Sequence, residues 1–395
     1  MDIRVDWPGR GHEFTEEEIQ AVATVMRAKN TALTQGTKVL QFEKDFSAYL
    51  KSENAFSLMS AAHGLDIAAM LIDIKPGDEV IIPAHTYCAS AIAFARRGAK
   101  IKWADINPFT FTASVDSVLN LFSEKTKAIV IVHLYGLISP DIEEFVKIAK
   151  DKKVFLIEDC AQSLGAKFKG KHCGTFGDIG CYSFHAQKNI TTLGEGGVIT
   201  VSNPEMAKKV TGLRLNGHAP FQNKPEYWLP AMINVDEDMI DVWPIKSTMN
   251  EPQAAVGSLI IARMDALTEA RRERGIRIRK ELKEIVELQF QEVYMDEAHS
   301  HHLLPARVVS SKWNRDSLIR TLFNDYGIKT IIQFYPLYRY DLFKKKGLSD
   351  ANVPQTDSFF DNMISFPFSL VIEETDFQYM IDSIKSAVYK LNSNN

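Results

Sequence analysis

Seven short apolar runs lie between residues 54 and 201, and they limit the possible folds more than any other feature of the chain. Helical patterns separate them, for example over 64–74, 86–98 and 140–153. Apolar runs that alternate with helices are typical of strands joined by crossover helices. The sequence therefore predicts an α/β fold with a mostly parallel, seven-stranded sheet. The predicted strands are NAFSLM (54–59), EVIIP (79–83), KIKWADI (100–106), KAIVIVHLYG (127–136), VFLIEDC (154–160), DIGCYSF (178–184) and GVITV (197–201).

The rest of the chain predicts a smaller second unit. A long helical pattern begins at Asn250, a suitable N-cap, and runs to about residue 282 as a bridge. We predict a large domain over 1–260, with an N-terminal arm over 1–35, and a small α+β domain over 261–395. The elements expected in the small domain are strands at 303–310 and 329–338 and helices at 315–327 and 374–391.

Composition and charge argue against several classes of protein. Hydrophobic residues make up 45% of the 395 and charged residues 24%, as in ordinary globular proteins. The net charge of −4 provides no basic field for nucleic acid or an acidic membrane. No apolar run approaches the ~20 residues of a membrane span, and the first residues lack the apolar core of a signal peptide. We therefore expect a cytoplasmic protein without nucleic-acid or membrane partners.

Two groups of residues raise the question of a metal site. The four cysteines have no CxxC spacing, so reduced structural thiols are the better interpretation. His299, His301 and His302 are close in sequence but lack a cysteine or carboxylate partner at ligand spacing. We predict no metal.

An acid and a lysine in neighbouring motifs carry the chemistry. Asp159 ends a buried apolar run, where an unpaired carboxylate is costly and needs a cationic partner. A protonated pyridine nitrogen would be one such partner, and a structural salt bridge is the alternative. Lys188 follows another strand among small and polar residues. Partial desolvation there would lower its pKa and free the amine for Schiff-base chemistry, although a single lysine is more often a surface residue.

Further residues extend this pattern. Ser183 offers a hydroxyl for a phosphate, and GEGG (194–197) offers backbone that passes close to a ligand. GEGG alone is weak evidence. The spacing of Asp159, Gln162, Ser183, Lys188 and GEGG as one unit is strong evidence.

At these motifs the sequence resembles the DegT/StrS family of sugar aminotransferases, which belong to the aspartate-aminotransferase (fold type I) superfamily. The resemblance extends over most of the chain. Its motifs are LTQGTKVLQFEKDFSAYL (33–50), KPGDEVIIPAHTYCAS (75–90), VHLYG (132–136), EDCAQSLGA (158–166), FGDIGCYSFHAQKNITTLGEGGVITV (176–201), NEPQAAVG (250–257) and FYPLY (334–338).

The resemblance implies a pyridoxal 5'-phosphate cofactor, with pyridoxamine phosphate as the intermediate form. Lys188 matches the lysine that binds the cofactor and moves the proton between the substrate carbon and the cofactor's C4′ carbon. Asp159 matches the acid on the pyridine nitrogen, and Gln162 the amide near the 3′ oxygen. Tyr87 matches the aromatic residue that stacks on the ring, and Ser183 a phosphate-binding hydroxyl.

The phosphate-binding turn departs from the family pattern. The family usually has Ser-Gly-Thr or Ser-Ala-Thr at the start of a helix, whereas this chain has Ser60, Ala61, Ala62 and His63. Backbone N–H groups at the helix start still suit a phosphate. His63 or water would replace the missing threonine hydroxyl.

Two further departures lie where the family shapes its substrate pocket. Lys246, Ser247 and Thr248 stand in place of Asn-Tyr-Arg, in a loop that the resemblance assigns to the neighbouring subunit's active site. Lys246 is thus a candidate ligand of the cofactor phosphate across a dimer. Gln333 and Tyr338 stand where family members often carry histidines.

The leading functional hypothesis is transfer of an amino group from an amino acid to a keto sugar linked to a nucleotide. The family resemblance implies glutamate or glutamine as the amino donor. A cyclitol ketone or a small keto phosphate as acceptor remains an alternative. A sugar dehydratase ranks lower, because the dehydratases of this family replace the lysine with histidine. A non-catalytic regulator would be expected to lose Lys188 or Asp159. A dinucleotide oxidoreductase lacks support because no GxGxxG joins a strand to a helix.

We also expect a homodimer with shared active sites. The resemblance places the active sites at a subunit boundary, and the 220–250 stretch carries aromatic residues and prolines suited to an interface arm.

Overall fold

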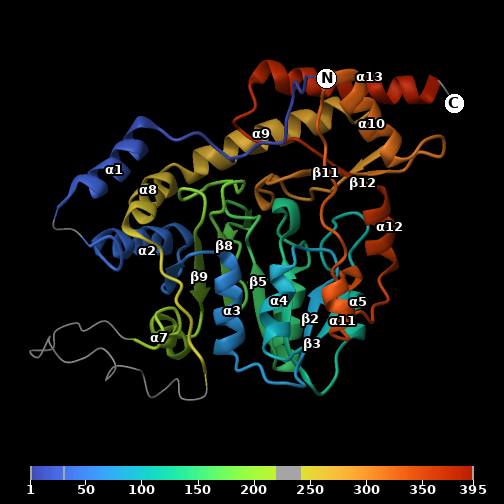
Figure 1. Ribbon diagram of the computed structural model, residues 1–395. Coiled ribbons are helices and arrows are strands. Elements are labelled where there is room, and N and C mark those ends of the chain that lie inside the picture. Colours follow the sequence, from blue (N-terminus) through green and yellow to red (C-terminus); the bar gives the residue numbers. More distant parts are fainter. Residues whose placement is uncertain (1, 30–31, 219–241, 394–395) are drawn as a thin grey trace, which may run out of the picture.

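The computed structural model describes residues 2–29, 32–218 and 242–393. At its centre lies a seven-stranded sheet in the order β1-β9-β8-β5-β4-β2-β3 (Figure 1). Five adjacent strands run parallel, whereas β9 is antiparallel to both β8 and β1. The predicted mostly parallel sheet is confirmed, with all seven strands. They are β1 (Ala55–Leu58), β2 (Glu79–Pro83), β3 (Lys100–Ala104), β4 (Thr126–Val132), β5 (Phe155–Asp159), β8 (Ile179–Ser183) and β9 (Gly197–Val201).

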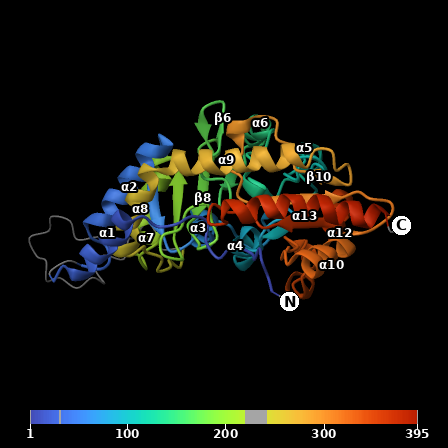
Figure 2. The same ribbon diagram turned by 90° about the horizontal axis from the view of Figure 1, so that it is seen from above.

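Helices cover both faces of this sheet (Figure 1, Figure 2). One face packs against α3 (Ala61–Leu71), α4 (Ala89–Arg96) and α7 (Pro204–Leu213). The other packs against α5 (Val115–Asn120) and α6 (Ile142–Lys152). Strands buried on both faces need apolar residues at nearly every position, which explains the continuous apolar runs of the sequence.

A further group of helices packs against the end of the sheet formed by β1, β9 and β8. It contains α1 (Glu16–Arg27), α2 (Thr37–Leu50) and α8 (Glu251–Ala262). The buried Glu251 carboxylate accepts three backbone N–H bonds of 2.9–3.1 Å from the start of α2, at Gly36, Lys38 and Val39. An acid at this end also complements the helix dipole. Glu251 therefore fixes the start of α2 against α8.

The bridge to the C-terminal part consists of two helices instead of the predicted single one. Asn250 caps α8 as predicted and forms a capping box with Gln253. Arg263 then breaks the pattern, and α9 (Met264–Glu281) follows. The Arg263 side chain bonds to Glu18 and to the carbonyl of Glu13, so it fastens this break to the N-terminal region.

The C-terminal part contains an antiparallel sheet of β10 (Leu288–Phe290), β11 (Leu304–Val308) and β12 (Met363–Phe366). A core that includes β11, β12, α10 (Arg315–Tyr326) and α13 (Glu374–Ser393) stabilises it. Figure 2 shows α9 and α13 side by side, and ion pairs such as Lys385–Glu281 join them. Among the described residues, no helix has the length and apolar character needed to span a bilayer.

The strand predicted over residues 329–338 is wrong. Apart from an isolated bridge between Ile331 and Ser365, this segment has no ladder, and the third strand of the small sheet is β12. The N–H of Leu337 bonds instead to Ala84, just after β2, and its side chain packs in the large core. The remaining short elements are β6 (Lys167–Phe168), β7 (Lys171–His172), α11 (Asp341–Lys345), α12 (Pro354–Asn362) and the 3-10 turns at Leu134–Gly136, Asp296–Ala298 and Leu337–Arg339.

The division of the chain near residue 260 stays a prediction. The start of α9 packs in the core around the large sheet through Met264 and Leu267, whereas Ile278 near its end packs in the small core. Phe343 of α11 also packs in the large core. Packing in this region therefore does not follow the sequence boundary.

Candidate active site

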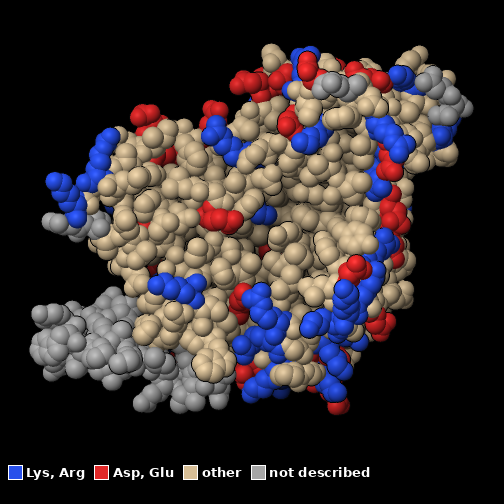
Figure 3. Space-filling view, in the orientation of Figure 1, with Lys and Arg blue, Asp and Glu red and all other residues tan. Residues whose placement is uncertain are grey.

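A cavity of about 590 Å³ lies where the ends of β5 and β8, the start of α3, an N-terminal segment and the loop after residue 332 meet. Figure 3 shows this face of the molecule hollowed between the large sheet and the C-terminal elements. Ligands of open α/β sheets bind outside the carboxyl ends of the strands, as here. The predicted site residues that line the cavity are Ser60, Ala61, Ala62, Tyr87, Asp159, Gln162, Ser183 and Lys188.

Asp159 is the last residue of β5 and has an exposed fraction of only 5%. The Ser90 hydroxyl donates to its Oδ2 at 2.7 Å, and the Ala161 N–H donates to its Oδ1 at 3.1 Å. No lysine, arginine or histidine of the described residues lies within ion-pair distance of it. A buried carboxylate held by two neutral donors leaves a favourable place for a cation at this end of the cavity.

Lys188 lies after β8 on the same cavity and is half-buried. Desolvation lowers the pKa of its amine to about 8, and the negative charge of Asp159 opposes part of this effect. The N–H of Lys188 bonds to the His185 carbonyl, which fixes the turn that carries it. A lysine with this pKa is partly neutral near pH 7 to 8, as a nucleophilic amine must be.

The start of α3 forms an anion cradle at the cavity wall. Ser60 is the N-cap, and its hydroxyl accepts from the His63 N–H at 3.3 Å. The first N–H groups of a helix, here those of Ala61 and Ala62, have no intrahelical acceptor and carry the positive end of the helix dipole. His63 also lines the cavity, and its Nδ1 lies 3.2 Å from the Ser60 hydroxyl.

The GEGG motif is placed against this cradle. A Cβ on Gly197 would lie 2.4 Å from the Ser60 carbonyl carbon, so only glycine lets β9 approach the start of α3 this closely. Gly196 forms a bridge with Ser60. The motif thus positions the backbone of the cradle, and its Glu195 lines the cavity.

Gln162 and Tyr87 line the cavity, and the NH₂ group of Gln162 and the aromatic ring of Tyr87 could each contact the ring of a cofactor. The Tyr135 N–H donates to Gln162 Oε1 at 2.7 Å, so the NH₂ group of the amide points away from Tyr135. An NH₂ donor suits a ring oxygen. Tyr87 is 59% exposed and meets Phe334 edge to face. Ser183, at the end of β8, accepts the His185 N–H and completes the polar lining near Lys188.

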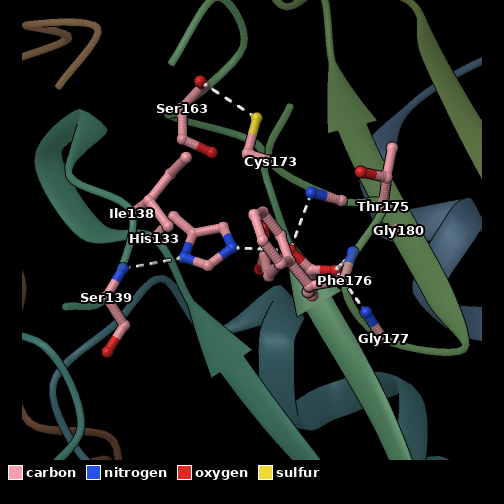
Figure 4. A network of polar contacts seen from close by, with 12 residues as sticks. His133, Ile138, Ser139, Ser163, Cys173, Thr175, Phe176, Gly177 and Gly180 are labelled. Atoms are coloured by element: carbon pink, nitrogen blue, oxygen red, sulfur yellow. Dashed lines mark hydrogen bonds and ion pairs between the residues drawn. The ribbon is translucent and has the colours of Figure 1, made fainter. Parts of the chain in front are cut away.

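A buried polar network behind the cavity fixes the end of β5 (Figure 4). Glu158 accepts three backbone N–H bonds of 2.7 Å, from Gly174, Phe176 and Gly177. It also lies 2.9 Å from His133 Nε2. Although Glu158 and His133 cluster with Cys160 in a geometry that metals use, these contacts occupy the carboxylate oxygens. We assign the network a structural role, because it fixes the residue next to Asp159.

The histidine cluster near residue 300 is also structural. The rings of His299 and His301 stack at 4.1 Å, and His302 Nδ1 lies 3.1 Å from Asn189 Oδ1. Burial lowers the pKa of all three rings well below the usual value. His302 also lines the cavity, next to the Lys188 turn, which the sequence did not indicate.

Lys246 is absent from the cavity lining of its own chain. It is exposed and forms an isolated bridge with Leu215. Its predicted role at a neighbouring subunit's cofactor stays a prediction. Residues 219–241, which make up most of the predicted interface arm, lie outside the described residues.

The sequence analysis missed several residues that the fold brings to the site. Ser90 holds Asp159, and Trp7 and Arg10 line the cavity from the N-terminal segment. Ser90 lies three residues after Tyr87 in a predicted helix, which is the only sequence signal for it. Trp7 and Arg10 belong to WPGRG, whose proline and glycines indicate an irregular segment but no site.

The residues present fit the predicted cofactor. The buried Asp159 carboxylate suits a protonated ring nitrogen, the Lys188 amine suits an aldehyde, and the α3 cradle suits a phosphate. All three line one cavity.

Comparisons with known proteins agree with this assignment. A profile of the DegT/DnrJ/EryC1/StrS aminotransferase family matches residues 12–385. A GDP-perosamine synthase of Escherichia coli O157:H7 is 30% identical over 79% of this chain and 80% of its own. A protein of Geobacillus stearothermophilus named as a pleiotropic regulatory protein is 31% identical over 94% of both chains. A candidate sugar aminotransferase of Streptococcus pneumoniae, solved in its pyridoxal phosphate form, is 27% identical with a TM-score of 0.85, covering 97% of this chain and 99% of its own.

Proposed function

The chain belongs to the DegT/DnrJ/EryC1/StrS aminotransferase family, and on this premise we propose that it transfers an amino group from glutamate to a keto sugar linked to a nucleotide. The chain is a pyridoxal-phosphate-dependent aminotransferase related to sugar aminotransferases. The observation that carries the proposal is the presence of Asp159, Lys188 and the α3 cradle on one cavity. The GDP-linked product in the name of the Escherichia coli relative supports the nucleotide-linked acceptor.

In this proposal each residue has one task. The bound cofactor supplies a ring that accepts the electrons of the bond broken at the amino acid's α-carbon. Asp159 pairs with the ring nitrogen and keeps it protonated. Lys188 Nζ removes the proton from the α-carbon and returns one at the cofactor's C4′ carbon, and it performs the reverse transfer with the acceptor. The N–H groups of Ala61 and Ala62 hold the phosphate, and Tyr87 holds the ring.

The glutamate half-reaction tests this assignment. Purified protein with its cofactor should show an absorbance band that shifts on adding glutamate, and Lys188→Ala should abolish the shift. Lys208→Ala, an exposed residue of α7, is the matched control and should behave like wild type. A regulator that only binds cofactor would show no shift in any of the three proteins.

Acceptors of three kinds distinguish the remaining alternatives. A nucleotide-linked 4-keto sugar, a cyclitol ketone and a small keto phosphate should each be offered to the glutamate-treated protein. Mass spectrometry should detect amination of the nucleotide-linked compound alone. Loss of water from the sugar without gain of nitrogen would indicate the dehydratase instead. A homodimer and a cytoplasmic location stay predictions.

A further inference from the structure

The N-terminal segment forms one wall of the cavity through Trp7, Pro8 and Arg10. Its backbone is fastened to the Lys188 turn, because the N–H of Gly11 bonds to Ala186 at 3.2 Å. The C-terminal part fastens it from the other side: the Ser369 hydroxyl donates to the carbonyl of Arg10 at 2.8 Å. Contacts on both sides hold the backbone of Arg10 in place at the cavity.

Within the described part of the chain, the only ion pair of Arg10 is a loose one of 3.8 Å to Glu13, and both side chains are more than half exposed. Such an exposed ion pair contributes little stability, so a bound anion can easily take the place of Glu13. Among the described residues, Arg10 and Lys188 are the only lysines or arginines that line the cavity. Because the Lys188 amine is assigned to the cofactor, Arg10 is the remaining side chain that carries a permanent positive charge in this lining.

The substrates of the proposed reaction are anions. Glutamate brings two carboxylates, and a nucleotide-linked sugar brings a diphosphate. A carboxylate that leaves water needs a charged donor to offset its desolvation, and the planar guanidinium matches carboxylate or phosphate oxygens with two parallel bonds. A polar cavity wall without such a donor would bind these groups poorly.

We propose that the Arg10 guanidinium binds an anionic oxygen group of a substrate, with the carboxylate of the amino donor as its first ligand. This inference rests on the proposed aminotransferase function and adds a substrate-binding residue to it. The N-terminal segment then forms the wall that binds the substrate, whereas the motifs between residues 60 and 197 bind the cofactor.

Binding of an unreactive dicarboxylate tests the inference without turnover. Titration calorimetry of the cofactor-loaded protein with glutarate, which has no amine, measures affinity directly. Arg10→Gln should raise the Kd of glutarate about 10- to 100-fold, as expected for loss of a charged hydrogen bond of about 1.5–3 kcal/mol. Arg10→Lys should fall between wild type and Arg10→Gln, since it keeps the charge but not the paired donors.

A matched control separates this effect from disturbance of the segment. Arg4 lies on the same segment, pairs with Asp376 on the surface and does not line the cavity. Arg4→Gln should therefore leave glutarate affinity unchanged. Cofactor content, measured by absorbance, should be the same in all variants, because Arg10 is assigned to substrate.

A second probe, inorganic pyrophosphate, distinguishes the two anion sources. Weakened glutarate binding alone assigns Arg10 to the donor carboxylate, and weakened pyrophosphate binding alone assigns it to the acceptor's phosphates. Equal affinities of wild type and Arg10→Gln for both probes, no binding of either probe to wild type, or loss of cofactor from Arg10→Gln overturns the inference. Failure of the proposed function would appear separately, as an absent glutamate shift in wild type.

Discussion

At the scale of single residues, Asp159 and Lys188 differ in how the protein surrounds them. Neutral donors hold the Asp159 carboxylate in place, whereas Lys188 is desolvated without a carboxylate in contact. Asp159→Asn keeps the side-chain shape but removes the charge that pairs with the ring nitrogen. We expect the glutamate half-reaction, followed by stopped-flow absorbance, to slow by about a hundred-fold or more. Ser90→Ala keeps the charge and should slow it far less; equal losses would mean that only carboxylate position matters.

The pKa of Lys188 predicts a pH-dependent difference in stability. Its pKa is about 8 in the folded protein without cofactor and near 10.5 in the unfolded chain. Between these values the unfolded chain binds more protons, so stability rises with pH from about 8 to 10.5, and below pH 8 the full cost of the buried charge is present. Lys188→Met has no such group. Its free energy of unfolding should exceed that of the cofactor-free wild type by about 1–3 kcal/mol at pH 7, after allowing for partial exposure.

Denaturant unfolding of both proteins at pH 7 and pH 10 measures this difference. The difference in free energy of unfolding between Lys188→Met and the cofactor-free wild type should be smaller at pH 10 than at pH 7. A constant difference would show that the amine is already solvated and that burial does not set its pKa.

The sequence could identify those residues whose chemistry is tied to a local motif. Lys188, Asp159 and Gln162 each occupy a fixed place in a short segment next to a strand, so their convergence followed from the parallel sheet. Arg10 and Ser90 could not be identified in this way. Their positions at the site depend on contacts between segments far apart in the chain, such as Ser90 with Asp159 and Ser369 with Arg10.

At the scale of elements, local sequence patterns predicted the large sheet, whereas they did not predict all strands of the small sheet. The strands of the large sheet are mostly buried on both faces and therefore appear as apolar runs. By contrast, β10 has only three residues, too few to show a period. The segment 329–338 is apolar enough for a strand, but the N–H of Leu337 bonds to Ala84 just after β2, so a tertiary contact overrides the local pattern.

The N-terminal segment provides a prediction at this scale. A Cβ on Gly11 would lie 1.8 Å from the Lys188 carbonyl oxygen, so Gly11→Ala must push the segment away from the Lys188 turn. We expect a loss of about 1–3 kcal/mol of stability and reduced retention of cofactor, measured by thermal unfolding and by absorbance after dialysis. Gly9→Ala is the matched control, because its Cβ would meet nothing within 4 Å. Similar behaviour of the two variants would contradict a tight contact at Lys188.

At the scale of the whole molecule, the anion cradle at the start of α3 is made of uncharged groups. Ser60, Ala61 and Ala62 offer a hydroxyl and backbone N–H groups, and the exposed Lys246 is absent from the lining of the same chain's cavity. The family resemblance assigns the loop of Lys246 to the neighbouring subunit's active site, and in a two-fold symmetric dimer such a contact would occur twice. The prediction is therefore that Lys246 acts across the interface.

Mixed dimers can test this arrangement. Lys188→Ala and Lys246→Glu should each be nearly inactive as pure dimers. After unfolding together and refolding at equal amounts, half of the dimers should be mixed, and each mixed dimer has one site with both lysines intact if Lys246 acts in trans. Activity should then recover to about a quarter of wild type, because half of the dimers carry one working site of two. If Lys246 acts within its own chain, no mixed site has both lysines and no activity returns; a monomeric mass with full activity would exclude the shared site altogether.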